Sequence, residues 1–103
     1  MTERTAFVLR VRPDKIDEYV RAHQEVWPEM LEALRGAGIR NYTIFRDGNR
    51  MFGYFEADDL DAAGQYLAQQ DVSARWQDAM AELLEERVPD GGPPSLQEVF
   101  RLD

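Results

Sequence analysis

Two short apolar segments flank an Asp-Gly pair at positions 47 and 48, and this pattern restricts the fold more than any other part of the chain. Residues 39–46 read IRNYTIFR and residues 51–56 read MFGYFE, both rich in the aromatic and β-branched side chains that strands favour. An Asp-Gly pair between two such segments is a strong signal for a tight hairpin turn. We therefore expect an antiparallel pair of strands in the middle of the chain.

A helical pattern precedes the hairpin. Pro13 and the aspartates that follow it suit a first helical turn, and apolar residues then recur with the helical period as far as Leu34. Pro28 disfavours helical geometry at the residue before it, so we expect a kink or a break near residues 24–28. The helical segment is expected to stop at Gly36-Ala-Gly38.

Two further helices are expected after the hairpin. Asp58 or Asp59 can cap a helix that runs to about Ala68, and Asp71 can cap another. The apolar stripe of the later helix consists of Val72, Trp76, Met80 and Leu83.

Strand-like segments lie near both ends of the chain. Residues 5–11 read TAFVLRV, and residues 96–100 read LQEVF after a loop-like PDGGPP at 89–94. The predicted order of elements is therefore βαββαβ, which is the ferredoxin-like arrangement of an antiparallel sheet with helices on one face. We expect an α+β fold with a single domain over residues 1–103.

Alternation along the predicted strands leaves neither face of the sheet uniformly polar. Residues 5–11, for example, place Phe7 and Leu9 on one face but Ala6 and Val8 on the other. An antiparallel sheet with water on one face usually shows a clean apolar and polar alternation. We therefore expect the face away from the helices to be covered, by the sheet of a second subunit.

Charge and composition argue against several classes of partner. The 103 residues include 20 acidic and 12 basic side chains, a formal net charge of −8, which disfavours nucleic acid and anionic membranes. There is no cysteine, no recognisable signal peptide and no apolar stretch of the ~20 residues that a membrane span needs. A cytoplasmic location is the expectation.

His23, the single histidine, is the leading candidate for chemistry. It lies four residues from both Tyr19 and Trp27, so all three share one helical face. One interpretation is a partly buried histidine bonded to backbone or to a carboxylate at the edge of the core. The other is a general acid or base, because an unperturbed pKa of about 6.5 suits proton transfer near neutral pH. Periodicity alone leaves both open.

Other kinds of site have little support in the sequence. The sequence has one histidine and no cysteine, and it contains no HExxH motif. We therefore expect no metal site. No GxGxxG, Walker or GxSxG motif is present, so no cofactor is expected. The tyrosines at 19 and 42 each carry a hydroxyl that needs a partner when buried, and that partner can be protein or ligand.

The chain resembles the L-rhamnose mutarotases along nearly its whole length. The resemblance rests on AFVLRV at 6–11 followed by Pro13, EY-x3-H-x3-WPEM at 18–30, NYTIF at 41–45, DV-x2-RW at 71–76 and LQEVF at 96–100. The block around His23 is the most specific of these, because it fixes Tyr, His, Trp and Pro together.

This resemblance implies a fold, a partner and a reaction. The fold is a dimeric α+β barrel in which two ferredoxin-like sheets pack face to face. The reaction is the interconversion of the α and β anomers of L-rhamnose or a related pyranose by acid/base ring opening, without a cofactor or metal. His23 matches the catalytic proton donor, Tyr19 and Tyr42 match sugar-contacting tyrosines, and Trp76 matches the first of a tryptophan pair at the sugar site.

Gln77 stands where the family pattern has the second tryptophan. An apolar face toward the sugar is thereby replaced with a hydrogen-bonding amide, so the preferred sugar can differ from L-rhamnose. Two alternatives remain at this point. One is a cofactor-free oxygenase or cyclase with the same barrel, and the other is a non-catalytic domain that binds a small ligand.

Overall fold

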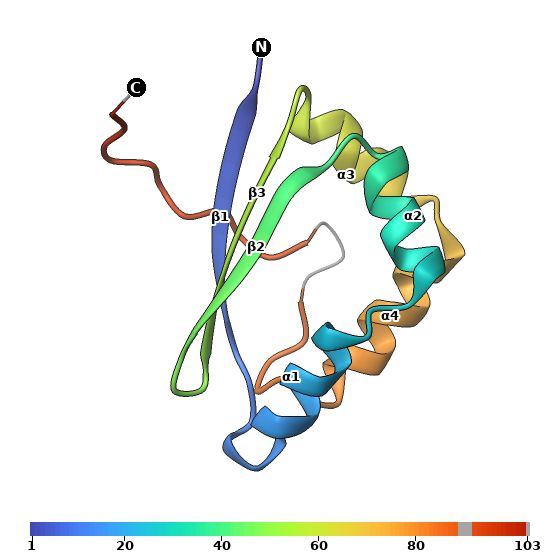
Figure 1. Cartoon of the computed structure of the whole chain (residues 1–103), viewed down its shortest axis with the longest axis vertical. Helices are drawn as coiled ribbons and strands as arrows, with labels where there is room; N and C mark the ends of the chain where they lie inside the picture. Colours follow the sequence, from blue (N-terminus) through green and yellow to red (C-terminus); the bar gives the residue numbers. More distant parts are fainter. Residues whose placement is uncertain (89–91, 103) are drawn as a thin grey trace.

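Three strands form one antiparallel sheet in the order β1-β3-β2 (Figure 1). The computed structural model describes residues 1–88 and 92–102. Its strands are β1 (Glu3–Arg10), β2 (Arg40–Asp47) and β3 (Arg50–Ala57). The predicted hairpin is confirmed, because β2 and β3 pair directly and Gly48 supplies the positive φ of 60° that the turn between them uses. The predicted α+β class is likewise confirmed.

Four helices cover one face of this sheet (Figure 1). They are α1 (Ile16–Gln24), α2 (Pro28–Gly36), α3 (Leu60–Ala68) and α4 (Asp71–Ala81), and a short 3-10 turn, η1 (Pro13–Lys15), precedes α1. The predicted break is confirmed, since α1 ends at Gln24 and Pro28 is the first residue of α2. None of the helices in the described part of the chain is long and apolar enough to cross a membrane.

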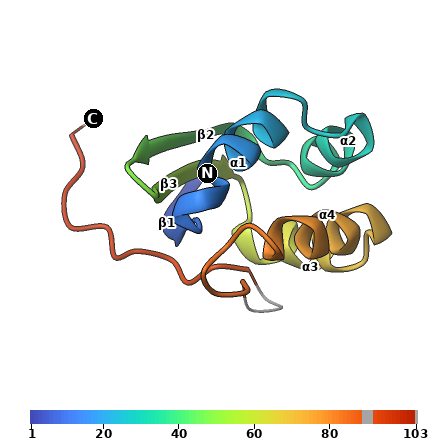
Figure 2. The same ribbon diagram turned by 90° about the horizontal axis from the view of Figure 1, so that it is seen from below.

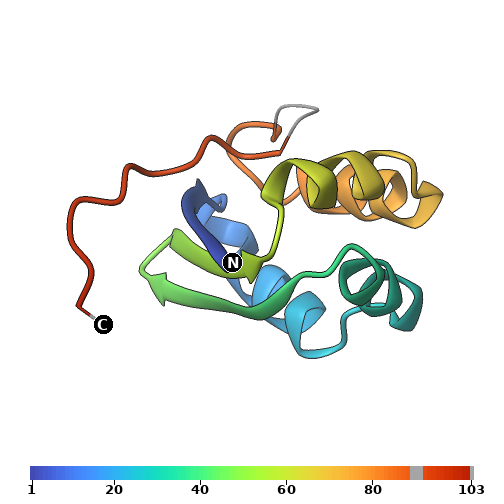
Figure 3. The ribbon, with the colours of Figure 1, turned by 90° about the horizontal axis from the view of Figure 1, so that it is seen from above.

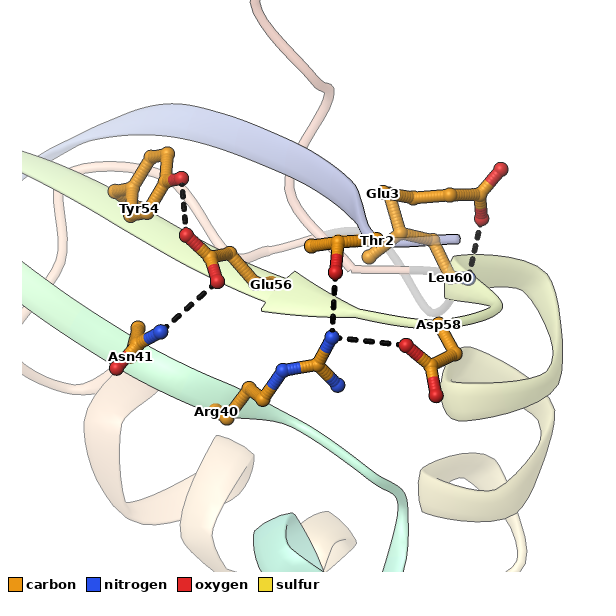
Figure 4. Close-up of polar contacts among 8 residues, drawn as sticks. All are labelled: Thr2, Glu3, Arg40, Asn41, Tyr54, Glu56, Asp58 and Leu60. Carbon is orange, nitrogen blue, oxygen red and sulfur yellow. Dashed lines mark hydrogen bonds and ion pairs between the residues drawn. The ribbon is translucent and has the colours of Figure 1, made fainter. Parts of the chain in front are cut away.

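Side chains near the start of α3 tie the strands to the helix (Figure 4). The Glu3 carboxylate accepts a hydrogen bond from the backbone N–H of Leu60, and the guanidinium of Arg40 donates to Thr2 and Asp58. The predicted cap at Asp59 is confirmed, because its carboxylate accepts from the N–H of Ala62.

The prediction for the start of α4 was wrong by one residue. Gln70 is the N-cap and Asp71 is the first helical residue. The Asp71 carboxylate makes no cap bond and instead accepts a hydrogen bond from Nε of Arg75, four residues later.

The predicted last strand is absent from the described residues. Residues 96–100 form no ladder, and their link to the sheet is one backbone hydrogen bond of 2.8 Å from Leu96 N to the Ala6 carbonyl, beside side-chain contacts of Ser95 and Glu98. The segment then runs past β1 and away from the helices (Figures 2 and 3). One backbone bond is too little pairing to hold an extended segment as an edge strand. Of the predicted loop at 89–94, residues 89–91 lie outside the described residues.

The core lies between the inner face of the sheet and the helices. Its central cluster consists of Val11, Tyr19, Met51, Leu83 and Leu84, all less than 9% exposed. A second cluster, built on Met30, Ala33 and Val72, joins α2 to α4. Leu84 also forms a backbone bridge with Val11, so the segment that follows α4 is joined to the residue that follows β1.

Gly53 allows a close approach inside the sheet. It lies directly opposite Phe7 in the pairing of β1 with β3, and a Cβ atom at position 53 would be only 2.2 Å from the Phe7 ring. The aromatic ring therefore lies over the glycine and fills the space of the missing side chain. Phe7 is 4% exposed in this position.

We expect the substitution Gly53→Ala to destabilise the fold by about 1–3 kcal/mol, because the added methyl group forces the Phe7 ring out of its place. Urea denaturation followed by circular dichroism measures the change. Gly64→Ala in α3 is the matched control, since a Cβ there meets nothing within 4 Å. That variant should be neutral or more stable by about 0.5–1 kcal/mol. Equal effects of the two substitutions would contradict the close approach at Gly53.

Candidate functional site

Helix α1 places Tyr19 and His23 one above the other. Their rings stack with centroids 4.1 Å apart and an angle of 26° between the planes. Tyr19 is 3% exposed and belongs to the central core cluster, whereas His23 is half-buried. The predicted proximity of these two residues, from their four-residue spacing, is confirmed.

A hydrogen bond within α1 orients the imidazole of His23. Nδ1 lies 2.9 Å from the backbone carbonyl oxygen of Tyr19. A carbonyl oxygen only accepts, so the hydrogen of neutral His23 belongs on Nδ1 and the lone pair belongs on Nε2. Nε2 is therefore the nitrogen that can take or give a proton to a ligand. The bond also bears out part of the simpler interpretation of His23, since one ring nitrogen does bond to the backbone.

Trp76 of α4 contacts both the imidazole of His23 and the ring of Trp27 at the start of α2. Its ring meets His23 edge-on with centroids 5.4 Å apart, and it meets Trp27 edge-on at 5.0 Å. Trp27 also packs against the α2–α4 cluster, as a core residue would. Helices α1 and α4, together with the N-cap residue of α2, thus contribute to one connected aromatic wall beside His23.

The inner face of the sheet supplies a second aromatic wall. Tyr42 stacks on Phe55 at 5.1 Å, and both contact Phe7, at 6.2 Å for Tyr42 and 6.4 Å for Phe55. Tyr42 belongs to the edge strand β2, which explains why 40% of this residue is exposed although it lies on the inner face.

Several polar atoms of these walls have no partner in the protein. The Tyr19 hydroxyl, the Tyr42 hydroxyl and Nε2 of His23 form no hydrogen bond with a described residue. Among the described residues that are not themselves exposed, however, no fully buried side-chain nitrogen or oxygen lacks a partner. The Tyr19 hydroxyl and Nε2 of His23 must therefore remain accessible to water. Unpaired polar groups set among aromatic rings are the typical lining of a site for a small polar ligand.

Burial shifts the pKa values of all three groups. It lowers the pKa of His23, and the hydrogen bond to the Tyr19 carbonyl opposes this shift only in part. Burial raises the pKa of Tyr19 to about 12. The pKa of Tyr42 is also raised, mainly by burial and secondly by the nearby Tyr19. At neutral pH both phenols are hydrogen-bond donors, and the imidazole is largely neutral.

Gln77 lies on α4 beside Trp76 but makes no hydrogen bond or ring contact with a described residue. Its half-buried amide is thus near the site without being engaged by the protein. Ser73, one helical turn earlier, is buried and was missed by the sequence analysis. A single serine in a helix carries no pattern that indicates a site, and the only available signal is its four-residue spacing from Gln77.

Two cavities lie away from these residues. One, of about 230 Å³, is formed between α2 and the α3–α4 region, and its lining includes Glu32 and Tyr66. The other, of about 560 Å³, lies between the C-terminal segment and the sheet, and its lining includes Tyr54 and Phe100. His23 lines neither of them. In residues 1–88 and 92–102, no group of three or more His, Cys, Asp or Glu side chains is placed to hold a metal ion.

Comparisons with known proteins point to one family. A model of the L-rhamnose mutarotase family matches residues 4–102. An L-rhamnose mutarotase of Pectobacterium atrosepticum is 42% identical over 97% of this chain and 98% of its own length. An L-rhamnose mutarotase of Bacillus subtilis is 38% identical over 98% of this chain and 99% of its own.

Solved structures agree with the observed fold. An L-rhamnose mutarotase of Formosa agariphila superimposes with a TM-score of 0.78 at 30% identity, over 98% of this chain and 99% of that one. The tetracenomycin F2 cyclase of Streptomyces glaucescens superimposes with a TM-score of 0.63 at 20% identity, over 98% of this chain and 97% of that one. At this lower identity, the cyclase shows a shared fold alone.

The lowered pKa of His23 predicts a pH-dependent stability. Between the lowered pKa in the folded state and about 6.5 in the unfolded chain, the unfolded state binds the additional proton. We expect the protein to lose stability relative to His23→Gln as the pH falls from about 6.5 through the lowered pKa. Urea denaturation of both proteins at several pH values from 8 to 5 measures this difference. A difference that stays constant over that range would contradict the burial effect on His23.

Proposed function

The chain belongs to the L-rhamnose mutarotase family and interconverts the anomers of a pyranose, and we propose that His23 is the proton donor of this isomerase. The substrate is L-rhamnose or a closely related sugar, and one domain over residues 1–103 carries the site. The observation that carries the proposal is the geometry of His23. Its Nδ1 is bonded to the Tyr19 carbonyl, and its Nε2 is unpaired and accessible beside two aromatic walls.

Anomer interconversion requires two proton transfers and no oxidation. The ring oxygen gains a proton and the anomeric hydroxyl loses one, while the bond between C1 and the ring oxygen breaks to give an aldehyde. Rotation about the C1–C2 bond and closure on the opposite face then give the other anomer. Protonated His23 gives the Nε2 proton to the ring oxygen and regains it on closure, while water or a second group of the site accepts the anomeric proton.

The remaining site residues bind and orient the sugar in this proposal. The hydroxyls of Tyr19 and Tyr42 donate hydrogen bonds to sugar oxygens, because their raised pKa values keep them protonated. Trp76 covers an apolar face of the sugar, and the Gln77 amide lies beside it. No residue of this set requires a metal or a cofactor for its role.

Exchange spectroscopy tests the activity directly. We expect saturation transfer between the anomeric protons of L-rhamnose with the wild-type protein, and a rate about 10²–10⁴-fold lower with His23→Gln, because a positioned acid or base contributes about that much. L-fucose, L-lyxose and D-ribose run in parallel report the sugar preference. Gln65→Leu on the exposed face of α3 is a control that should keep the wild-type rate.

The pH dependence of the catalysed rate distinguishes a proton donor at His23 from a general base at His23. If His23 acts as the donor, the catalysed rate falls as the pH rises through its lowered pKa. A rate that instead rises to a plateau above that pKa would make His23 the base. A flat profile from pH 5 to 9 with the fold intact would remove His23 from proton transfer.

A homodimer is the second part of the proposal, supported by the outer face of the sheet. Val8, Phe52 and Phe45 lie opposite one another across all three strands and form an outer apolar row. Val8 is 37% exposed and Phe45 is 67% exposed, although both lie within strands that pair with the central strand β3. Such a row on a sheet face is the kind of surface that a second copy covers in an isologous pair.

The surroundings of the outer apolar row are self-complementary in charge. On this same face Glu56 accepts hydrogen bonds from Tyr54 at 2.6 Å and from Asn41 at 2.9 Å (Figure 4). Arg4 and Arg40 lie opposite Glu56 in the neighbouring strands. A face that carries both signs of charge around an apolar centre can pair with a copy of itself. A cytoplasmic location stays a prediction, which cell fractionation can check.

Phe45→Glu should weaken the pairing, because it puts a charge into the centre of the outer apolar row. We expect the dimer dissociation constant to rise at least tenfold, or about 1.4 kcal/mol, in light scattering and sedimentation velocity. Gln65→Glu adds the same charge on α3 and should leave the mass of the dimer in solution unchanged. A wild-type protein that sediments as a monomer at high micromolar concentration would exclude the dimer.

A further inference from the structure

Ser73 is a buried polar residue that the structure leaves without a partner. It is 7% exposed, and its hydroxyl forms no hydrogen bond with any described residue. A serine in a helix commonly bonds back to the carbonyl one turn earlier, and here it does not. Because no fully buried polar side-chain atom in the described part of the chain is unpaired, the hydroxyl must border an accessible space.

Gln77 lies one turn after Ser73 on the same side of α4. Its amide is half-buried and likewise makes no hydrogen bond with a described residue. Successive residues of a helix are about 100° apart, so Ser73, Gln77 and Met80 fall on one edge of α4. Met80 packs against the central core cluster, which includes Met51 of β3, whereas Val72 packs against α2. The edge with Ser73 and Gln77 therefore faces toward the sheet.

This edge lies beside residues of α4 that contact the site. Trp76 lies between Ser73 and Gln77 in sequence and contacts His23 directly. Met80, one turn further along α4, packs against the cluster that contains Tyr19. The unpaired hydroxyl and amide thus lie on the helix that also carries Trp76, whose ring belongs to the aromatic wall beside His23.

We propose that Ser73 and Gln77 form a hydrogen-bonding subsite on α4 that binds one hydroxyl group of the pyranose. This rests on the proposed function, because it assigns a sugar to the space beside His23. A hydroxyl both donates and accepts, and the pair supplies a carbonyl acceptor, an amide donor and a second hydroxyl. Ser73 and Gln77 are then specificity-determining residues, since they contact a part of the sugar that does not react.

The subsite selects for the presence of a hydroxyl. A site built to hydrogen-bond a substrate hydroxyl rejects an analogue that lacks it, because buried polar groups are then left unpaired. The aromatic rings cannot provide this discrimination, since they accept any apolar sugar face. The ligand class is therefore a pyranose that presents a hydroxyl toward α4, and a sugar with an apolar group there binds more weakly.

Binding and exchange measured together test the proposal. The variants are Ser73→Ala, Gln77→Leu and the double variant, with Gln65→Leu as the matched control on α3. The sugars are L-mannose, L-rhamnose and L-lyxose, which differ only in carrying hydroxymethyl, methyl or hydrogen on C5. Isothermal titration calorimetry gives Kd, and exchange spectroscopy gives kcat and KM. Ser73→Ala removes a single atom and keeps the test valid even if Gln77→Leu fails to fold.

We expect Kd and KM to rise about tenfold in each variant and kcat to change less than twofold. The lost hydrogen bond stabilises the bound sugar and the transition state equally, so its loss weakens binding and leaves the chemical step unchanged. A loss confined to L-mannose places the bound hydroxyl on C6, and an equal loss for all three sugars places it on the ring. Unchanged Kd values in both single variants would overturn the subsite, whether or not the wild type is active. Variant-dependent Kd values without any exchange would retain the subsite and reject the proposed function.

Discussion

The hydrogen bond between Nδ1 of His23 and the Tyr19 carbonyl oxygen fixes the orientation on which the whole site depends. The bond engages Nδ1 within α1 and leaves Nε2 directed away from that helix. The stacked Tyr19 ring and the edge of Trp76 then restrict how the imidazole can turn. The same packing withdraws water from the imidazole and lowers its pKa. One local interaction therefore couples the tautomer, the direction and the acidity of the only histidine.

Much of this arrangement follows from sequence because it depends on short-range chemistry. The break at Pro28 follows from a missing N–H and a restricted preceding residue, and the hairpin follows from the Asp-Gly pair. The four-residue spacing of Tyr19 and His23 also places them together without tertiary information. The contact of His23 with Trp76 joins α1 to α4, and no spacing in the sequence predicts it. The resemblance to a family implied only that both residues belong to the sugar site.

The features that were missed depend on long-range pairing. The LQEVF segment has the composition of a strand, but a strand also needs a neighbour along its length. Among the described residues, one backbone hydrogen bond links this segment to the sheet. Ser73 is buried because of what packs around α4, and no local pattern encodes that. The choice of Gln70 rather than Asp71 as the cap is a difference of one residue, within the range where local preference does not decide a helix boundary.

The irregularity in β2 bears on how the molecule avoids fibrils. β2 is an edge strand, and its pairing with β3 shifts register between Arg40 and Thr43, where Asn41 takes a positive φ of 54°. A bulge twists an edge so that another chain cannot continue the ladder, and charged residues such as Arg46 add repulsion along it. Growth of the sheet by addition of strands at this edge is thereby discouraged. The proposed homodimer instead uses the outer face of the sheet, where a twofold contact closes on itself and stops.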